Sequence, residues 1–321
     1  MNKNKIPVIV IFAPTATGKT ALTVKLFGSG SHSFFKNKAE IISADSMAVY
    51  KYMDIGTAKP SKDLISQIPH HMIDLVNPDI QFSVSDFVNK ADELCNEIYL
   101  KGKIPVIVGG TGFYIRNFLL GLPQTPESDL QIRNQLKSEL EKSGSDFMYQ
   151  KLKTIDPISA EKINKNDVYR ILRALEVFYI TGKPRSSFVL FEKLREQYNF
   201  LPIVLERNRE DLYNRIDLRI DQMFLDGLEQ EVNLLISLGY KKEDPGMQAI
   251  GYREFFMNLD SLEDIKQKIK HDSHKYAKKQ YVFMKGIPNA KIYHIEKDQE
   301  YTEEVLSKIK DFIFTIENNV I

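Results

Sequence analysis

Five short runs of apolar and β-branched residues are spread along the chain, and segments with helical periodicity separate most of them. The runs cover residues 6–12, 39–43, 104–108, 202–205 and 291–295. Strands that alternate with helices are typical of a parallel sheet covered by helices. The pentapeptide Ile-Pro-Val-Ile-Val occurs twice, beginning at Ile6 and at Ile104. Because neither copy has a polar position, we interpret both as central strands whose two faces are buried.

Helical patterns fill the segments between these runs. Residues 83–102 combine a capping box, formed by Ser83 and Asp86, with an apolar stripe that includes Cys95. Residues 209–239 repeat apolar positions at helical spacing, which predicts one long amphipathic helix.

The stretch from 129 to 182 differs from the rest of the chain. It has helical patterns, at residues 130–140 and 168–180, and no convincing strand. We interpret it as part of an all-helical insertion that interrupts an α/β core. The predicted domains are a core in residues 1–122 and 200–321 and a helical insertion domain in residues 123–199.

The segment after the first predicted strand carries a phosphate-binding pattern. It reads Ala13, Pro14, Thr15, Ala16, Thr17, Gly18, Lys19 and Thr20. A loop of this kind between a strand and a helix directs backbone N–H groups at an anion. Lys19 adds a positive charge, and the Thr20 hydroxyl is placed to hold Mg²⁺. Ala13 stands where the pattern has its first glycine, which leaves less freedom at positive φ. The expected fold class is therefore α/β, a P-loop NTPase-like parallel sheet with an inserted helical domain.

Other polar residues are expected at the same edge of the sheet. Asp45 directly follows the second apolar run, and Thr111 lies in a glycine-rich turn after the third. The carboxyl ends of neighbouring parallel strands share one crevice, so both should lie near the phosphate loop. Asp45 there could hold Mg²⁺ or act as a general base. Arg215 and Arg219 could reach an anion in this crevice or pair with neighbouring aspartates.

Composition constrains the function without changing this picture. The 321 residues carry 44 Lys and Arg against 43 Asp and Glu, so the overall charge gives no signal for nucleic acid. Residues 266–285, however, are rich in lysine with interleaved aromatic rings, which suits looped RNA or a solvated helix with an aromatic core face. The single cysteine excludes an internal disulfide, and we see no leader or bilayer-spanning run, so we expect a cytoplasmic protein.

Together and in this order, the motifs resemble those of one family, the tRNA dimethylallyltransferases, also called tRNA isopentenyltransferases. The likeness covers nearly the whole chain, and the absence of a zinc-binding cysteine pair after the core favours the bacterial type. Besides the phosphate loop, the matching stretches are residues 43–46, 54–60, 69–74, 109–111, 170–176, 181–182, 215–223, 248–252 and 276–280.

The resemblance implies a reaction and its site residues. Members transfer a dimethylallyl group from dimethylallyl diphosphate to N6 of adenine 37, beside the anticodon of tRNA. Residues 13–20 would then bind the diphosphate with Mg²⁺ at Thr20. Asp45 would take the proton from N6, with Thr111 and Arg219 assisting. The residues implied to bind tRNA are Asp45, Ser46, Met47, Ala48, Thr111, Arg133, Tyr169, Arg170, Ile171, Leu172, Arg173, Gln248, Gly251, Tyr252, Arg253, Lys278, Lys279, Gln280 and Lys285. We expect a monomer that acts on the anticodon stem-loop, with no membrane partner.

The chain departs from the family pattern at a few positions. Ala13 replaces the usual glycine, and Ala48 stands where many members have glutamine. Lys279 and Lys285 replace arginines. Lysine lacks the planar fork of arginine, so these changes bear on RNA affinity more than on the reaction.

Three other functions are compatible with parts of the sequence. A P-loop nucleotide kinase or ATPase would turn over ATP without RNA and use Asp45 as a metal ligand. An adenylate isopentenyltransferase would modify free AMP or ADP, which needs neither the basic segment nor the insertion. An RNA-binding module with a vestigial loop would not need the intact Gly18, Lys19 and Thr20.

Overall fold

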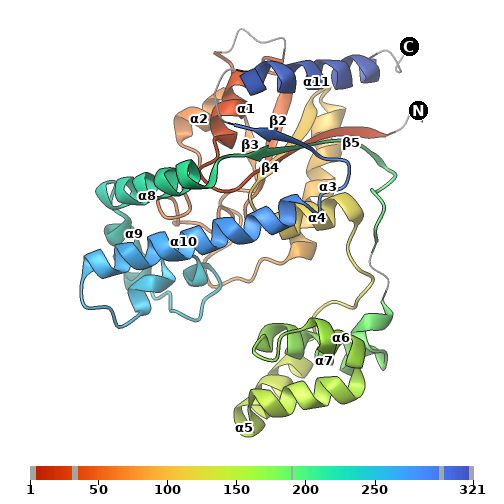
Figure 1. The fold of residues 1–321 in the computed structure, drawn as a ribbon, viewed down its shortest axis with the longest axis vertical. Helices are drawn as coiled ribbons and strands as arrows, with labels where there is room; N and C mark the ends of the chain where they lie inside the picture. Colours follow the sequence, from red (N-terminus) through yellow and green to blue (C-terminus); the bar gives the residue numbers. More distant parts are fainter. Residues whose placement is uncertain (1–4, 31–34, 189–190, 296–299, 318–321) are drawn as a thin grey trace. The chain divides into compact units, whose positions relative to one another are not determined.

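The chain folds into two compact units. The computed structural model describes residues 5–30, 35–188, 191–295 and 300–317. The core unit comprises Met1–Gly121 and Lys193–Ile321, and the helical unit comprises Leu122–Glu192 (Figure 1). Residues 193–199, which we expected in the insertion, belong to the core unit because a strand of the sheet begins at Tyr198.

A six-stranded sheet forms the centre of the core unit, and all neighbouring strands are parallel. The strand order is β3-β2-β4-β1-β5-β6. The strands are β1 (Ile6–Phe12), β2 (Ala39–Ala44), β3 (His70–His71), β4 (Ile104–Gly109), β5 (Tyr198–Glu206) and β6 (Lys291–His294). The two pentapeptide copies form β1 and β4, which pair at the centre with Ile9 opposite Val106. This confirms the predicted α/β class and the central place of both strands.

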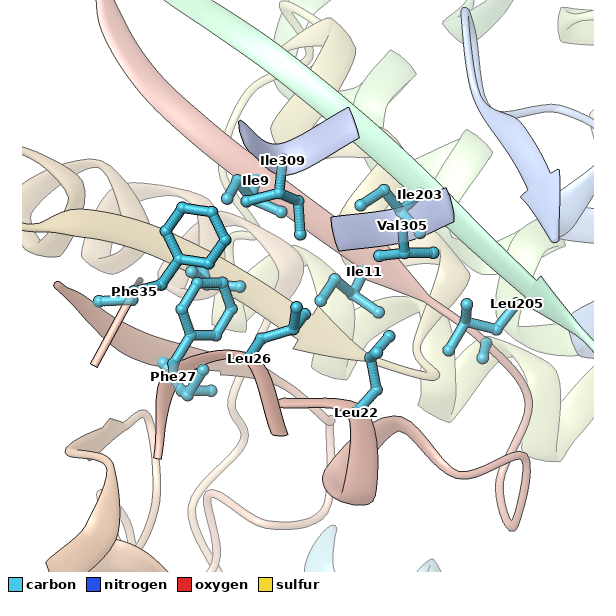
Figure 2. Close-up of a cluster of buried hydrophobic side chains, with 14 of the residues drawn as sticks. Ile9, Ile11, Leu22, Leu26, Phe27, Phe35, Ile203, Leu205, Val305 and Ile309 are labelled. Carbon is cyan, nitrogen blue, oxygen red and sulfur yellow. The ribbon is translucent and has the colours of Figure 1, made fainter. Parts of the chain in front are cut away.

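Besides the sheet, the core unit contains α-helices. They are α1 (Lys19–Phe27), α2 (Lys62–Gln67), α3 (Val84–Leu100), α4 (Gly112–Leu120), α8 (Arg209–Leu225), α9 (Leu228–Ser237), α10 (Leu262–Met284) and α11 (Glu300–Glu317). Figure 2 shows the core under α1 and α11, where side chains of both helices meet Ile9 and Ile11 of β1 and Ile203 of β5. Each fully buried aliphatic side chain of this kind contributes about 1.5–3 kcal/mol.

Helix α3 packs against β1, β2 and β4 with the apolar stripe that the sequence predicted. Its capping box is formed as expected, with Ser83 and Asp86 bonded reciprocally. Cys95 lies on the buried stripe and is 0% exposed. Burial raises the pKa of its thiol, with the nearby carboxylate of Asp92 acting in the same direction. Cys95 is therefore a packing residue with an unreactive thiol.

The predicted single helix over residues 209–239 is wrong, since two helices occupy this stretch. Helix α8 ends at Leu225 and α9 begins at Leu228. Between them Gly227 has a φ of 100°, a left-handed conformation that interrupts the helix. Apolar residues of both helices enter the same buried cluster, so the hydrophobic spacing continues across the break and conceals it.

The helical unit consists of α5 (Leu130–Ile155), α6 (Pro157–Lys162) and α7 (Val168–Thr181). Gly144 kinks α5 with a φ of 82°. A cluster of buried side chains from all three helices forms the core of this unit. Within the described residues of the whole chain, no helix is both long and apolar enough to cross a membrane.

A buried carboxylate, Glu176 of α7, forms hydrogen bonds with the residues just before α5. Glu176 is 1% exposed and accepts hydrogen bonds from Ser128 Oγ at 2.5 Å and Arg173 Nη1 at 2.7 Å. The backbone N–H of Asp129 donates to it at 3.0 Å. Burial by itself would raise the pKa of Glu176, but these hydrogen bonds outweigh burial and lower it.

We expect Glu176→Ala to destabilise the helical unit by about 3 kcal/mol, because it leaves buried donors without an acceptor. A depressed pKa stabilises the fold above the unfolded-state pKa, so the difference from wild type should shrink as pH falls below about 4. Hydrogen exchange of α5 and α7 amides in the full chain measures this. Glu161→Ala, at an exposed position of α6, is the control. Equal protection in the two variants would contradict the prediction.

Candidate active site

The phosphate loop borders a cavity of about 960 Å³ at the carboxyl edge of the sheet. Its left-handed residues are Ala16, with a φ of 58°, and Gly18, with a φ of 113°. Ala13 is buried and does not have a positive φ. Its N–H donates to Gly109 O at 3.3 Å. The loop thus needs no glycine at position 13, which explains why alanine fits there.

Lys19 bends back onto its own loop. Its Nζ donates to the carbonyl oxygens of Ala13 and Pro14, both at 2.8 Å. Burial and the nearby Arg219 guanidinium lower the pKa of Lys19 to about 7, while Asp45 opposes them. The ammonium is therefore poised to gain a counter-charge, and an anion in the loop would restore its full protonation.

Three arginines hold three consecutive residues of the loop. Arg219 Nη1 donates to Thr15 Oγ1 at 3.3 Å, Arg215 Nε to Ala16 O at 3.0 Å, and Arg207 Nε to Thr17 O at 3.3 Å. The aspartates of α8 that could have paired with Arg215 or Arg219 have other partners. Arg207 Nη1 lies 2.7 Å from Asp211, and His274 Nε2 lies 2.8 Å from Asp217. Arg215 and Arg219 both line the cavity.

Asp45 follows β2 and lines the same cavity. Its Oδ1 accepts hydrogen bonds from Met47 N at 2.8 Å and Ala48 N at 3.3 Å. Within the described residues, Oδ2 accepts no hydrogen bond from the protein. Because one oxygen is tied to the backbone and the other is open, the carboxylate is oriented and can accept a proton.

Gln280 of α10 links the phosphate loop to the glycine-rich turn after β4. Its Oε1 accepts from Thr15 N at 3.2 Å, and its Nε2 donates to Gly110 O at 2.7 Å. A Cβ on Gly110 would lie 2.4 Å from this nitrogen, so only glycine permits the approach. Thr111 Oγ1 accepts a hydrogen bond from Ser46 N at 3.0 Å, so it holds the residue that follows Asp45. Thr111 itself does not line the cavity.

Tyr276 of α10 completes this side of the cavity. Burial followed by the Asp45 charge raises the pKa of its hydroxyl to about 12, although the side chains of Thr111 and Gln280 act in the opposite direction. Tyr276 therefore remains a neutral hydrogen-bonding group beside Asp45 at physiological pH.

The structure divides the remaining core-unit residues predicted to bind tRNA into three groups. Lining the cavity are Ser46, Met47, Ala48, Gln248, Gly251 and Arg253, and exposed on the surface of α10 or just beyond it are Lys278, Lys279 and Lys285. Tyr252 is 0% exposed, and Gln280 is 3% exposed although it also borders the cavity. Because both are buried and bonded within the protein, we revise their expected role from RNA contact to support of neighbouring residues.

In the helical unit the predicted residues also differ in exposure. Tyr169 is 71% exposed, and the Arg133 guanidinium lies 5.9 Å from its ring centre. Arg170 is also exposed. Ile171 is 0% exposed in the core of the unit, so it packs and does not contact RNA directly. Leu172 is partly buried against the same core, and Arg173 bonds to Glu176 and to Pro126 O.

Known proteins resemble this chain over nearly its whole length. The IPP transferase family model matches residues 48–286. The chain belongs to the IPP transferase family. It is 41% identical to the tRNA dimethylallyltransferase of Thermoanaerobacter sp. (strain X514) over 93% of this chain and 95% of that protein. The tRNA dimethylallyltransferase of Clostridioides difficile (strain 630) is 40% identical over 96% of this chain and 99% of that protein.

Solved structures of IPP transferases have the same fold. The tRNA isopentenylpyrophosphate transferase of Bacillus halodurans superposes with a TM-score of 0.68 at 32% identity, over 98% of this chain and 99% of that chain. A eukaryotic dimethylallyltransferase, crystallised acting on tRNA, gives a TM-score of 0.80 at 28% identity, over 96% of this chain and 80% of that one.

Two further residues, Arg207 and Glu231, shape the site of this IPP transferase without having been predicted from its sequence. Arg207 follows β5 directly, and the strand-end rule that located Asp45 would also have located it. Glu231 of α9 bonds to backbone groups 175–177 residues earlier. No local pattern in the sequence indicates such distant contacts.

Proposed function

We propose that the protein transfers a dimethylallyl group from dimethylallyl diphosphate to N6 of adenine 37 in tRNA. The observation that carries the proposal is one cavity that joins the phosphate loop to the open oxygen of Asp45. Part of its wall is apolar, formed by Ile216, Met223 and Ile250. A five-carbon allyl chain needs such a wall, whereas the polar part of an ATP molecule does not.

In the proposed reaction the diphosphate binds in the loop of residues 13–20 through the N–H groups of residues 16–20, because Pro14 has no N–H and those of Ala13 and Thr15 bond to Gly109 O and Gln280 Oε1. The bond between the allylic carbon and the diphosphate oxygen breaks, and negative charge develops on the leaving group. Lys19 and Arg219 lie where they can stabilise that charge. The bond from N6 to the allylic carbon forms, and the open oxygen of Asp45 takes the proton that N6 releases.

We propose Mg²⁺ as the cofactor and Thr20 as its protein ligand. Thr20 is exposed and lines the cavity with Asp45. Among the described residues, no three His, Cys, Asp or Glu side chains are arranged to hold a metal ion. A hydroxyl, the donor phosphates and water fit the oxygen-only coordination of Mg²⁺ without such a cluster. When bound, the ion would neutralise part of the diphosphate charge.

The test of the proposed function is transfer of labelled dimethylallyl from its diphosphate to unmodified tRNA in the presence of Mg²⁺. We expect label in wild-type acceptor and none in tRNA whose A37 is replaced by another base. Label in free AMP with none in tRNA would support an adenylate isopentenyltransferase. ATP hydrolysis without RNA, and no transfer, would support a kinase or ATPase.

Donor affinity should depend on pH through Lys19. Because burial and Arg219 lower its pKa to about 7, the free enzyme loses the ammonium as pH rises above that value. We expect the affinity for dimethylallyl diphosphate to fall up to about tenfold per pH unit above pH 7. The fall should end at the pH where Lys19 loses its proton in the donor complex as well. Calorimetric titration between pH 6 and 9 measures this. The Lys19→Arg variant keeps its positive charge, so its affinity for dimethylallyl diphosphate should change little between pH 6 and 9.

A further inference from the structure

One carboxylate of the core unit, outside the cavity itself, accepts hydrogen bonds from four donor groups. Glu231, in the first turn of α9, accepts from the backbone N–H groups of Asp54 and Ile55 at 2.8 Å and of Gly56 at 3.2 Å. The hydroxyl of Tyr252 donates to it at 2.6 Å. Consecutive N–H groups that converge in this way form an anion-binding concavity. Here the anion is the protein's own side chain.

The same contacts bring two separate loops together. Gly56 packs against the ring of Tyr252 so closely that a Cβ there would lie 2.5 Å from a ring carbon. A Cβ on Gly251 would lie 3.7 Å from Gly56 O, in ordinary contact. Residues 54–60 and 248–253 are therefore in contact. Glu231 adds a second link, because it bonds both to the backbone of the first loop and to Tyr252 of the second.

Both loops line the cavity, although Glu231 does not. Gly56, Thr57 and Ala58 come from the first loop, and Gln248 and Gly251 from the second. The far end of the first loop has its own anchor, because Lys59 Nζ donates to Tyr50 O at 2.6 Å and to Asp74 at 2.6 Å. Lys59 also reaches the near end, since its Nζ donates to Asp54 Oδ1 at 2.7 Å and its N–H to Asp54 O at 3.0 Å. What Glu231 alone supplies is the acceptor for the three consecutive N–H groups of residues 54–56. Its loss would leave these N–H groups without their acceptor while the contacts of Lys59 remain.

From these contacts we infer that Glu231 is a positioning residue for the RNA acceptor: it holds residues 54–56 and, through Tyr252, residues 248–253 in the shape that receives the target nucleotide. This inference rests on the proposed function. The phosphate loop has separate supports in Gln280, Arg207 and Arg219. The role of Glu231 therefore concerns the acceptor and not the diphosphate donor.

The kinetic test is Glu231→Gln. Glutamine keeps one acceptor oxygen but turns an NH₂ group toward N–H donors, so the hydrogen bonds cannot all be retained. We expect KM for tRNA to rise about tenfold, as for loss of a hydrogen bond to a charged group, with KM for dimethylallyl diphosphate within about twofold. Tyr252→Phe removes only the hydroxyl and should raise KM for tRNA about threefold. Glu229→Gln makes the same charge change in the same helical turn and should leave both values unchanged.

A second measurement does not depend on activity. Native-state hydrogen exchange of the amides at 54–56 should be at least about tenfold faster in Glu231→Gln than in Glu229→Gln. If wild type modifies tRNA but Glu231→Gln keeps the wild-type KM for tRNA, or raises only the donor KM, the inference is overturned. If wild type does not modify tRNA at all, the proposed function fails. Unchanged exchange at 54–56 would then overturn the positioning role as well.

Discussion

Asp45→Asn is expected to lower kcat for dimethylallyl transfer about a thousandfold, within the range that loss of a general base produces. Asparagine keeps the oxygen that accepts from Met47 and Ala48, so the turn after β2 should hold its shape. What is lost is the basic oxygen that accepts no hydrogen bond from the described residues. The loss should therefore fall on kcat, while the affinity for tRNA changes by less than about threefold.

Single-turnover transfer to tRNA and a gel-shift titration separate these two effects. Asp63→Asn, an exposed position in α2, is the control for the same chemical change. A kcat within threefold of wild type in Asp45→Asn would exclude Asp45 as the base. Loss of tRNA binding with normal chemistry would assign Asp45 to RNA recognition instead.

Arg219→Gln should have the second-largest effect, a decrease in kcat of about 10²–10³, comparable to loss of one group that stabilises transition-state charge. Arg219 reaches the phosphate loop at Thr15, and burial lowers its pKa while Asp45 opposes this. A charge held in such a place interacts strongly with the charge that develops on a leaving diphosphate.

The same substitution should also raise the pKa of Lys19, because the Arg219 charge is one of the causes that lower it. The fall in donor affinity above pH 7 should then shift to higher pH. Arg209→Gln, at the other end of α8, is the matched control, since Arg209 bonds to Tyr213 and lies outside the large cavity. Equal kcat values for the two variants would refute the role of Arg219.

The sheet could be predicted well from the sequence because its strands are short and buried on both faces. The apolar runs that became β1, β2 and β4 carry this signal without ambiguity. β5 begins at Tyr198, four residues before the apolar run that indicated it, and the polar Asn199 interrupts these first residues. β3 has only two residues, too few to leave any pattern.

The parts of the site that lie in loops at the ends of strands could be predicted from the sequence. Asp45 and the phosphate loop were found because they follow strands that share one edge of the sheet. Gln280 and Glu231 act on backbone groups 265 and 175–177 residues away, so only the folded chain shows what they hold. The left-handed turn at Ala16, with Ala13 outside it, could not be predicted either, because alanine rarely adopts a positive φ.

The buried position of Cys95 makes the protein convenient for spectroscopy. It is the only cysteine among 321 residues, and burial suppresses its thiolate. Cysteines introduced at exposed positions, such as Lys25 in the core unit and Lys165 in the helical unit, would then be the only thiols to react quickly with a maleimide dye. A donor–acceptor dye pair at these two positions would report by energy transfer whether tRNA changes the separation of the two units, with every native residue of the active site intact.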